Sequence, residues 1–164
     1  MGNIILIGMM GCGKSVIGAL LAQQLQMDFV DMDEYLQEKF QMTIPEMFEI
    51  SEDFFRQKET ASLKDALGFH NTVISCGGGV VMRDENIDLL KQVGTVVFID
   101  RPVANIVQDV DCLSRPLLKN GPERLYELDL IRRPKYIKAS DHQVHNDGSI
   151  EQTVKKINEI IKKG

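Results

Sequence analysis

The segment from Gly8 to Ser15 reads G-x-x-x-x-G-K-S, and this pattern constrains the possible folds of the chain more than any other feature of its sequence. The pattern is typical of a phosphate-binding loop, in which glycines let backbone N–H groups close around an anion. The apolar run at 3–7 precedes it with the composition of a strand, and Ile17, Leu20, Leu21 and Leu25 follow it at helical spacing. A glycine-rich turn that binds nothing is the alternative, but the context favours the strand, loop and helix that this motif requires.

The last two residues of the motif carry the charge and the hydroxyl that phosphate chemistry needs. We expect the Lys14 ammonium to reach the β- and γ-phosphates of a nucleotide and the Ser15 hydroxyl to bind Mg²⁺. The helix that begins near Lys14 directs the positive end of its dipole at the same anion. Cys12, inside the loop, is either a thiol activated by that helix terminus or a small residue that fills space. The expected nucleotide-binding residues are Gly11, Cys12, Gly13, Lys14, Ser15 and Val16.

Length and charge narrow the class of protein. With 164 residues, 43% of them hydrophobic, the chain can bury one core and is too short for two ordinary domains. Its net charge of −5 argues against nucleic-acid binding, and its apolar runs are too short to cross a membrane. Three cysteines without a C-x-x-C pair indicate a reducing compartment and no disulfide. We therefore expect one cytoplasmic domain that binds a small anionic ligand.

Strand-like and helix-like segments alternate along the chain, which predicts an α/β fold with a parallel sheet covered by helices on both faces. Thr43-Ile44-Pro45-Glu46 is typical of a capping box at the start of a short helix, and Asp84 is expected to cap another. The expected strands are 3–7, 29–30, 73–75, 96–99 and 143–145, and the expected helices include 52–67, one ending at about Ser140 and one with an apolar face from Ile150. The stretch 110–120 has no clear period and predicts a loop that moves over the site.

Two groups of residues follow expected strands, at the edge where ligands collect in parallel sheets. Asp31 and Asp33 follow the second strand, and their spacing lets one serve a metal and the other a substrate hydroxyl. The alternative for Asp33 is that it merely caps the next helix. Gly77, Gly78 and Gly79 follow the third strand, where absent side chains let a ligand approach the backbone closely.

Asp100 is a second candidate for the metal, because it ends an apolar strand in a pattern that holds Mg²⁺ in many phosphate-loop proteins. Arg101 and Pro102 follow it, so we expect Asp100 to start the next helix instead.

Arginines in separate segments complete the candidate site. Arg56, Arg115 and Arg132 each offer a fork of N–H donors that suits a carboxylate or a phosphate. Each arginine alone is more typical of a surface salt bridge. Only in combination with the acids and glycines do they indicate a binding site for a small anion.

Taken in order, these segments resemble the shikimate kinase family over nearly the whole chain. The resemblance is carried by Gly8 to Ser15, Asp31-Met32-Asp33, the segment 52–56 with Glu59, the segment 74–79, Arg115-Pro116-Leu117-Leu118 and Arg132-Arg133-Pro134-Lys135-Tyr136. It implies a three-layer P-loop NTPase fold of the nucleoside-monophosphate-kinase type with a five-stranded parallel sheet. It also implies a single kinase domain over 1–164, with a shikimate-binding segment at about 32–60 and a lid at about 110–121.

The resemblance further implies an activity: a monomer transfers the γ-phosphoryl group of ATP to the 3-hydroxyl of shikimate with Mg²⁺, in aromatic amino-acid biosynthesis. Ser15 and Asp31 would then serve Mg²⁺, which favours Asp31 over Asp100, and Asp33 is the candidate general base. Lys14 and Arg115, the latter on the lid, would neutralise charge on the transferred phosphoryl group. The residues expected to hold shikimate are Asp33, Arg56, Gly77, Gly78, Gly79 and Arg132.

The lid departs from the family pattern. Where the family carries a basic residue that packs on adenine, this chain reads Gln108-Asp109-Val110-Asp111-Cys112, and its acids would repel nucleotide phosphates if they pointed inward. Two alternatives follow: a kinase of the same fold for another acceptor, such as gluconate, and a nucleotide-dependent binding module without catalysis. The acids, glycines and arginines disfavour the first, and the intact phosphate loop and Arg115 disfavour the second.

Overall fold

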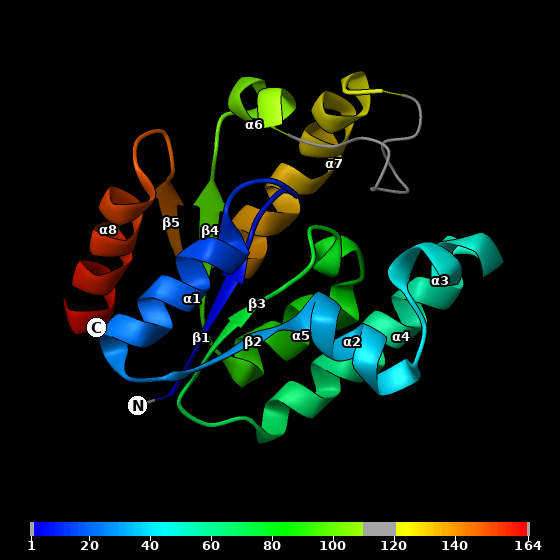
Figure 1. The fold of residues 1–164 in the computed structure, drawn as a ribbon, viewed down its shortest axis with the longest axis horizontal. Coiled ribbons are helices and arrows are strands. Elements are labelled where there is room, and N and C mark those ends of the chain that lie inside the picture. The colour runs from blue at the N-terminus through cyan, green and yellow to red at the C-terminus, as the bar shows by residue number, and fades with distance from the viewer. Residues whose placement is uncertain (1, 110–120, 164) are drawn as a thin grey trace.

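The computed structural model describes residues 2–109 and 121–163, which form a five-stranded parallel sheet between layers of helices (Figure 1). All strand pairings are parallel, in the order β2-β3-β1-β4-β5. The strands are β1 (Asn3–Ile7), β2 (Asp28–Asp31), β3 (Thr72–Ser75), β4 (Gly94–Asp100) and β5 (His142–His145). The predicted α/β class and sheet are therefore confirmed, and the carboxyl ends of the strands meet at one edge.

Helices cover both faces of this sheet (Figure 1). On one face α1 packs against α8, and on the other α5 packs against α7, with α4 beside α5 and α6 beside α7. The helices are α1 (Lys14–Leu25), α2 (Met32–Phe40), α3 (Ile44–Ile50), α4 (Glu52–Asp65), α5 (Asp84–Val93), α6 (Val103–Asp109), α7 (Glu123–Ala139) and α8 (Ile150–Lys163), with 3₁₀ turns η1 (Ala66–Gly68) and η2 (Val80–Met82).

The main core lies along the three central strands. Ile5 on β1 pairs with Ile74 on β3 and with Val96 on β4, and all three side chains are fully buried. Every residue of β1 and β3 is buried, as expected for strands that have helices on both faces and therefore form continuous apolar runs. This core holds the central strands in place, and so it fixes the carboxyl edge of the sheet, where the segments that follow the strands begin.

A second, smaller core holds α2, α3 and α4 together to one side of the sheet. Leu36, Met47 and Phe55 form its buried centre, and the Phe48 ring stacks on Phe55 with centroids 4.7 Å apart. The predicted capping box at Thr43 starts α3, since its side chain accepts a hydrogen bond from the backbone N–H of Glu46 and the Glu46 carboxylate accepts one in return. The segment 32–60 is therefore held by packing of its own.

Two predicted helix boundaries need correction. Asp84 does not cap α5, because the carbonyl of Arg83 accepts the first helical hydrogen bonds and Asp84 is the first residue of the helix. There its charge still favours the helix N-terminus. The helix predicted at 52–67 ends as an α-helix at Asp65 and continues as the 3₁₀ turn η1.

The moving loop predicted at 110–120 lies outside the described residues, and so does Arg115. Within residues 2–109 and 121–163, the helices are too short or too polar to cross a membrane.

The small core should be sensitive to cavity formation. Met47 is fully buried, so Met47→Ala is expected to lower the free energy of unfolding by about 2–5 kcal/mol, measured by urea denaturation. Ile50→Ala on the same helix is the matched control, because Ile50 is 58% exposed and its loss should change stability by no more than about 0.5 kcal/mol. Equal effects of the two substitutions would show that the core does not hold this segment.

Candidate active site

The phosphate loop joins β1 to α1 through backbone conformations that require glycine. Gly11 and Gly13 have φ of 77° and 97°, in the left-handed region that side chains rarely adopt. A Cβ atom on Gly8 would lie 2.5 Å from the carbonyl oxygen of Ile99. The motif glycines are therefore needed for the turn itself, before any ligand is considered.

Lys14 places its charge at the centre of this loop. Its ammonium donates to the carbonyl oxygens of Gly8 and Met9 at 2.8 and 2.9 Å, and the residue is only 8% exposed. Cys12 is 1% exposed, and its backbone N–H donates to the carbonyl of Met9 at 3.1 Å. Burial of the thiol favours the space-filling role over the reactive one for Cys12.

Ser15 and Asp31 form the oxygen pair expected at the metal site. The Ser15 hydroxyl donates to Asp31 Oδ2 at 2.7 Å. Asp31 Oδ1 accepts from the backbone N–H groups of Asp33 and Glu34 at 2.9 and 3.4 Å, so Asp31, and not Asp33, caps α2. Hard oxygen donors of this kind fit Mg²⁺, which binds one or two carboxylates together with water and substrate phosphates. The described residues contain no group of three or more His, Cys, Asp or Glu that could hold a metal.

Asp100, the other metal candidate, is engaged elsewhere and does not start a helix. Its carboxylate accepts two hydrogen bonds from Arg133, at 2.7 and 2.8 Å, and a third from Gln143 at 2.9 Å. The Arg133 guanidinium lowers the pKa of Asp100. The helix α6 begins at Val103, and the carbonyl of Pro102 accepts its first hydrogen bonds. The expectation for Asp100 was wrong because its partners come from α7 and β5, far along the chain.

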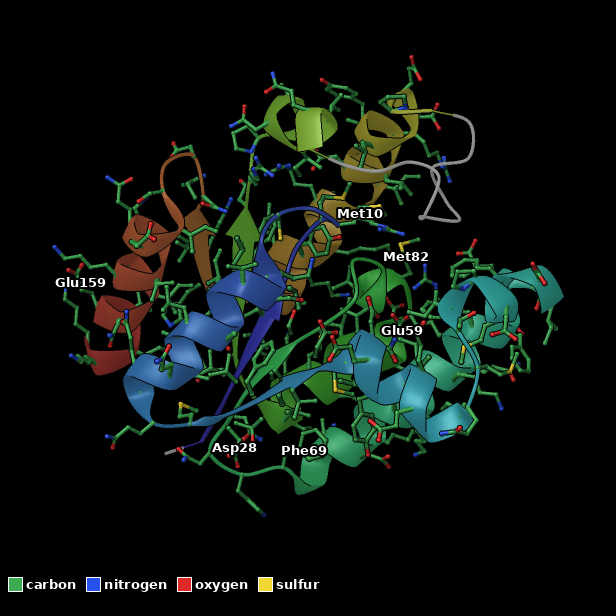
Figure 2. The ribbon with its side chains drawn as sticks, viewed as in Figure 1. Met10, Asp28, Glu59, Phe69, Met82 and Glu159 are labelled. Carbon is green, nitrogen blue, oxygen red and sulfur yellow. The ribbon has the colours of Figure 1, made fainter. Side chains whose placement is uncertain are left out.

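Two adjoining cavities open at the carboxyl edge of the sheet. The first, of ≈ 330 Å³, is lined by Met10, Gly11, Gly13, Lys14, Ser15, Val16, Asp31, Asp33, Ser75, Cys76, Gly77 and Gly78. The second, of ≈ 310 Å³, is lined by Met10, Asp33, Gln37, Ile44, Pro45, Phe48, Phe55, Arg56, Glu59, Gly77, Gly78, Gly79 and Arg132. Figure 2 labels two residues of the second cavity, Met10 from the phosphate loop and Glu59 from α4. Both cavities share Asp33, so a group bound in one faces a group bound in the other across this carboxylate.

Two buried arginines face the second cavity. Arg132 on α7 is 1% exposed, and its Nε and Nη1 have no hydrogen-bond partner among the described residues. Arg56 on α4 is 6% exposed, and its Nη1 donates to Glu59 at 2.9 Å. Burial, and then the positive charge of Arg56, lower the pKa of Arg132. Buried N–H donors without partners cost free energy, so this arrangement suits a small carboxylate that would bind both guanidinium groups.

Each glycine of the triplet makes room for one functional group. A Cβ atom on Gly77 would lie 2.7 Å from Asp33 Oδ1, and one on Gly78 would lie 3.2 Å from Arg132 Nη1. One on Gly79 would collide with the guanidinium of Arg56. The absent side chains therefore let the acid and the two arginines approach the backbone after β3.

Two residues acquire roles that sequence reasoning missed. Glu59 is 7% exposed and accepts a hydrogen bond from Arg56. Burial, together with the negative charge of Asp33, raises the pKa of Glu59 to about 7, although the positive charges of Arg56 and Arg132 oppose this shift. The i, i+3 spacing of Arg56 and Glu59 on one helix is compatible with an ion pair, but it does not reveal that the pair is buried.

The second residue is Tyr136 on α7, which is fully buried and donates its hydroxyl proton to the carbonyl of Gly78. It ties α7, which carries Arg132, to the glycine triplet.

The strand order, the phosphate loop and the adjoining cavity with its two buried arginines define a P-loop phosphotransferase for a small acidic acceptor. Comparison with known proteins narrows this class, because the model of the family described as shikimate kinase matches residues 10–162. The chain belongs to the shikimate kinase family.

Individual relatives agree with this assignment. A shikimate kinase of Clostridium botulinum is 48% identical over 159 residues, which cover 97% of this chain and 96% of that protein. The solved structure of the Acinetobacter baumannii shikimate kinase in complex with shikimate has a TM-score of 0.94 at 34% identity, covering 99% of this chain and 94% of that one. The Aquifex aeolicus shikimate kinase structure has a TM-score of 0.85 at 38% identity, with 98% and 96% covered.

The raised pKa of Glu59 predicts a pH dependence of stability. The unfolded chain releases this proton near the ordinary value of 4.5, whereas the folded chain keeps it up to about pH 7. Between these values the folded state binds more protons, so the free energy of unfolding should fall as pH rises, by at most about 1.4 kcal/mol per unit. Urea denaturation of the wild type and of Glu59→Gln from about pH 5 to pH 8 measures this. Parallel pH profiles for the two proteins would contradict the burial of an ionisable Glu59.

Proposed function

We propose that this chain transfers the γ-phosphoryl group of ATP to the 3-hydroxyl of shikimate, giving shikimate 3-phosphate and ADP on the way to chorismate and the aromatic amino acids. The observation that carries the proposal is the pair of cavities that meet at Asp33, one lined by the phosphate loop and the other by two buried arginines. Phosphoryl transfer asks a protein chiefly to position the reactants and to stabilise charge, and these cavities supply both.

On the donor side, Lys14 would hold the β- and γ-phosphates, and the backbone of Gly11 to Val16 would surround them. Ser15 and Asp31 would hold Mg²⁺, Asp31 through water, and the ion would neutralise phosphate charge when bound. The hydrogen bond between these two side chains supports their shared role. Arg115, proposed from the sequence alone, would come from the lid to stabilise the transferred group.

On the acceptor side, Arg56 and Arg132 would bind the carboxylate of shikimate, and the glycine triplet would let the ring approach the backbone. Asp33 would accept hydrogen bonds from the hydroxyls and would receive the proton of the 3-hydroxyl as it attacks phosphorus. Its place in the walls of both cavities supports this role, because the attacking oxygen must lie between donor and base. We also propose that the chain forms a single kinase domain, which is monomeric and cytoplasmic, as the sequence leads us to expect.

A coupled assay of ADP release tests the proposed function. Purified protein with Mg·ATP should turn over with shikimate and not with quinate, with gluconate or without acceptor. Shikimate binding without turnover would favour the non-catalytic binding module, and turnover with gluconate alone would show that the acceptor was misassigned.

The carboxylate site predicts different consequences for two neighbouring arginines. Arg132→Lys keeps the charge but loses the fork of donors, so the Kd of shikimate should rise by about 10- to 150-fold, from loss of about 1.5–3 kcal/mol. Arg133→Lys is the matched control, since Arg133 is bonded to Asp100 and Asp129 and does not line the cavity. Isothermal titration with shikimate and with Mg·ADP measures both variants. Similar losses of shikimate affinity in the two variants would remove Arg132 from the site.

A further inference from the structure

We propose that Asn146 is a positioning residue for the nucleotide. Its side chain holds the peptide between Cys12 and Gly13 so that the Gly13 N–H points into the cavity lined by Lys14, Ser15 and Asp31, called the phosphate cavity below. The inference deepens the proposed function and rests on it, because it concerns how the same loop binds the phosphates of ATP.

Asn146 follows β5 directly and joins three distant parts of the chain. Its backbone N–H donates to the carbonyl of Asp100 at 2.8 Å, and its side-chain Nδ2 donates to the carbonyl of Cys12 at 2.8 Å. Its Oδ1 accepts from the Thr153 hydroxyl on α8 at 2.8 Å, which is shorter than the 3.3 Å from that hydroxyl to the carbonyl of Ser149. Asn146 is 7% exposed and Thr153 is fully buried. The Asn146 side chain is therefore a buried part of the fold and not a surface group.

These partners define which way the amide points. A carbonyl oxygen only accepts hydrogen bonds, so the amide nitrogen of Asn146 must face Cys12. The amide oxygen then faces the Thr153 hydroxyl, which can donate to it. Thr153 thus holds Asn146 in the one orientation that binds the loop.

Holding the Cys12 carbonyl also orients the next N–H group. In a planar trans peptide the C=O and the following N–H point in opposite directions, and the described chain contains no cis peptide bond. The Cys12 carbonyl points to Asn146, which does not line the phosphate cavity, whereas Gly13 does. The Gly13 N–H is therefore directed away from Asn146 and toward the cavity.

The residues of the loop themselves do little to fix this peptide. Gly13 has a φ of 97° and no side chain, so little in the loop itself opposes rotation of the peptide plane. A rotated plane would present the Cys12 carbonyl oxygen to the phosphates, where like charges repel. A Cβ atom on Gly13 would lie 3.3 Å from Asn146 Nδ2, so the amide also packs closely behind this residue.

A second carbonyl group of the loop has a similar partner. Arg101 donates to the carbonyl of Gly11 at 2.8 Å. Asn146 supplies the partner for Cys12 from the far end of the chain. Arg101 and Asn146 do not line the cavity of the phosphate loop, so their contacts direct the Gly11 and Cys12 carbonyl oxygens away from it. Of these two contacts, the one from Asn146 acts on the peptide nearer the start of α1.

Isothermal titration with Mg·ADP and, separately, with shikimate tests this role in Asn146→Ala, Thr153→Val and Thr153→Ser. We expect Asn146→Ala to weaken Mg·ADP binding about tenfold or more, as for a buried carbonyl that loses its partner. Thr153→Val should weaken it in the same direction, and Thr153→Ser, which keeps the hydroxyl, should restore it. The Kd of shikimate should change by less than about twofold in all three, because Asn146 and Thr153 do not line that cavity.

The outcomes separate this inference from the function on which it rests. Wild-type protein that does not bind Mg·ADP would contradict the proposed function itself. Wild-type binding that is unchanged in both Asn146→Ala and Thr153→Val would overturn the positioning role. Equal loss of Mg·ADP and shikimate binding, with a lower Tm, would also overturn it, since Asn146 would then support the whole fold. If Asn146→Ala does not fold, the pair Thr153→Val and Thr153→Ser decides the question.

Discussion

The parallel order of the sheet, with β1 at its centre, is the constraint on which the rest of the site depends. Parallel strands bring all their carboxyl ends to one edge, and each strand here delivers a functional segment to it. β1 leads into the phosphate loop, β2 ends at Asp31, and β3 leads into the glycine triplet. β4 ends at Asp100, which accepts hydrogen bonds from Arg133 on α7. β5 is followed by Asn146, which donates a hydrogen bond to the Cys12 carbonyl of the phosphate loop. An antiparallel neighbour to β1 would direct one of these segments to the opposite edge.

Buried charge is the second organising feature of the site. Arg56 and Arg132 lie in the wall of one small cavity, and the carboxylate of Glu59 balances them only in part. Asp33 adds a further negative charge where the two cavities meet. Burial makes each of these charges costly, so the binding of a small organic anion between the arginines would relieve part of that cost. The burial of the two arginines, which is unfavourable by itself, would therefore contribute to recognition of the substrate.

Local patterns predicted what depends on local contacts. The phosphate loop, the capping box at Thr43 and the run of three glycines are readable because a few neighbouring residues determine their conformations. Contacts between distant segments were not readable in this way. The bidentate pair of Asp100 and Arg133 spans 33 positions, and the hydrogen bond from Asn146 to the Cys12 carbonyl spans 134. The local pattern at Asp100 therefore predicts a helix start that this residue does not occupy, and no local pattern marks Asn146.

Burial is the other quantity that the sequence did not reveal. The spacing of Arg56 and Glu59 fits an ordinary exposed pair on a helix surface, and only the packing of α4 beside α2 and α5 encloses it. The Tyr136 hydroxyl likewise acquires its partner, the carbonyl of Gly78, from the way α7 packs on η2. Titration and positioning roles depend on such enclosure, which is a property of the assembled fold.

The most direct test of the central claim, that two adjoining cavities hold donor and acceptor across Asp33, is a crystal structure with Mg·ADP and shikimate bound together. We expect ADP phosphates on the phosphate loop and the shikimate carboxylate on Arg56 and Arg132. We also expect the 3-hydroxyl beside Asp33, directed at the position that the γ-phosphate of ATP would occupy. Shikimate bound outside the cavity of Arg56 and Arg132, or with its carboxylate directed at the phosphate loop, would contradict it.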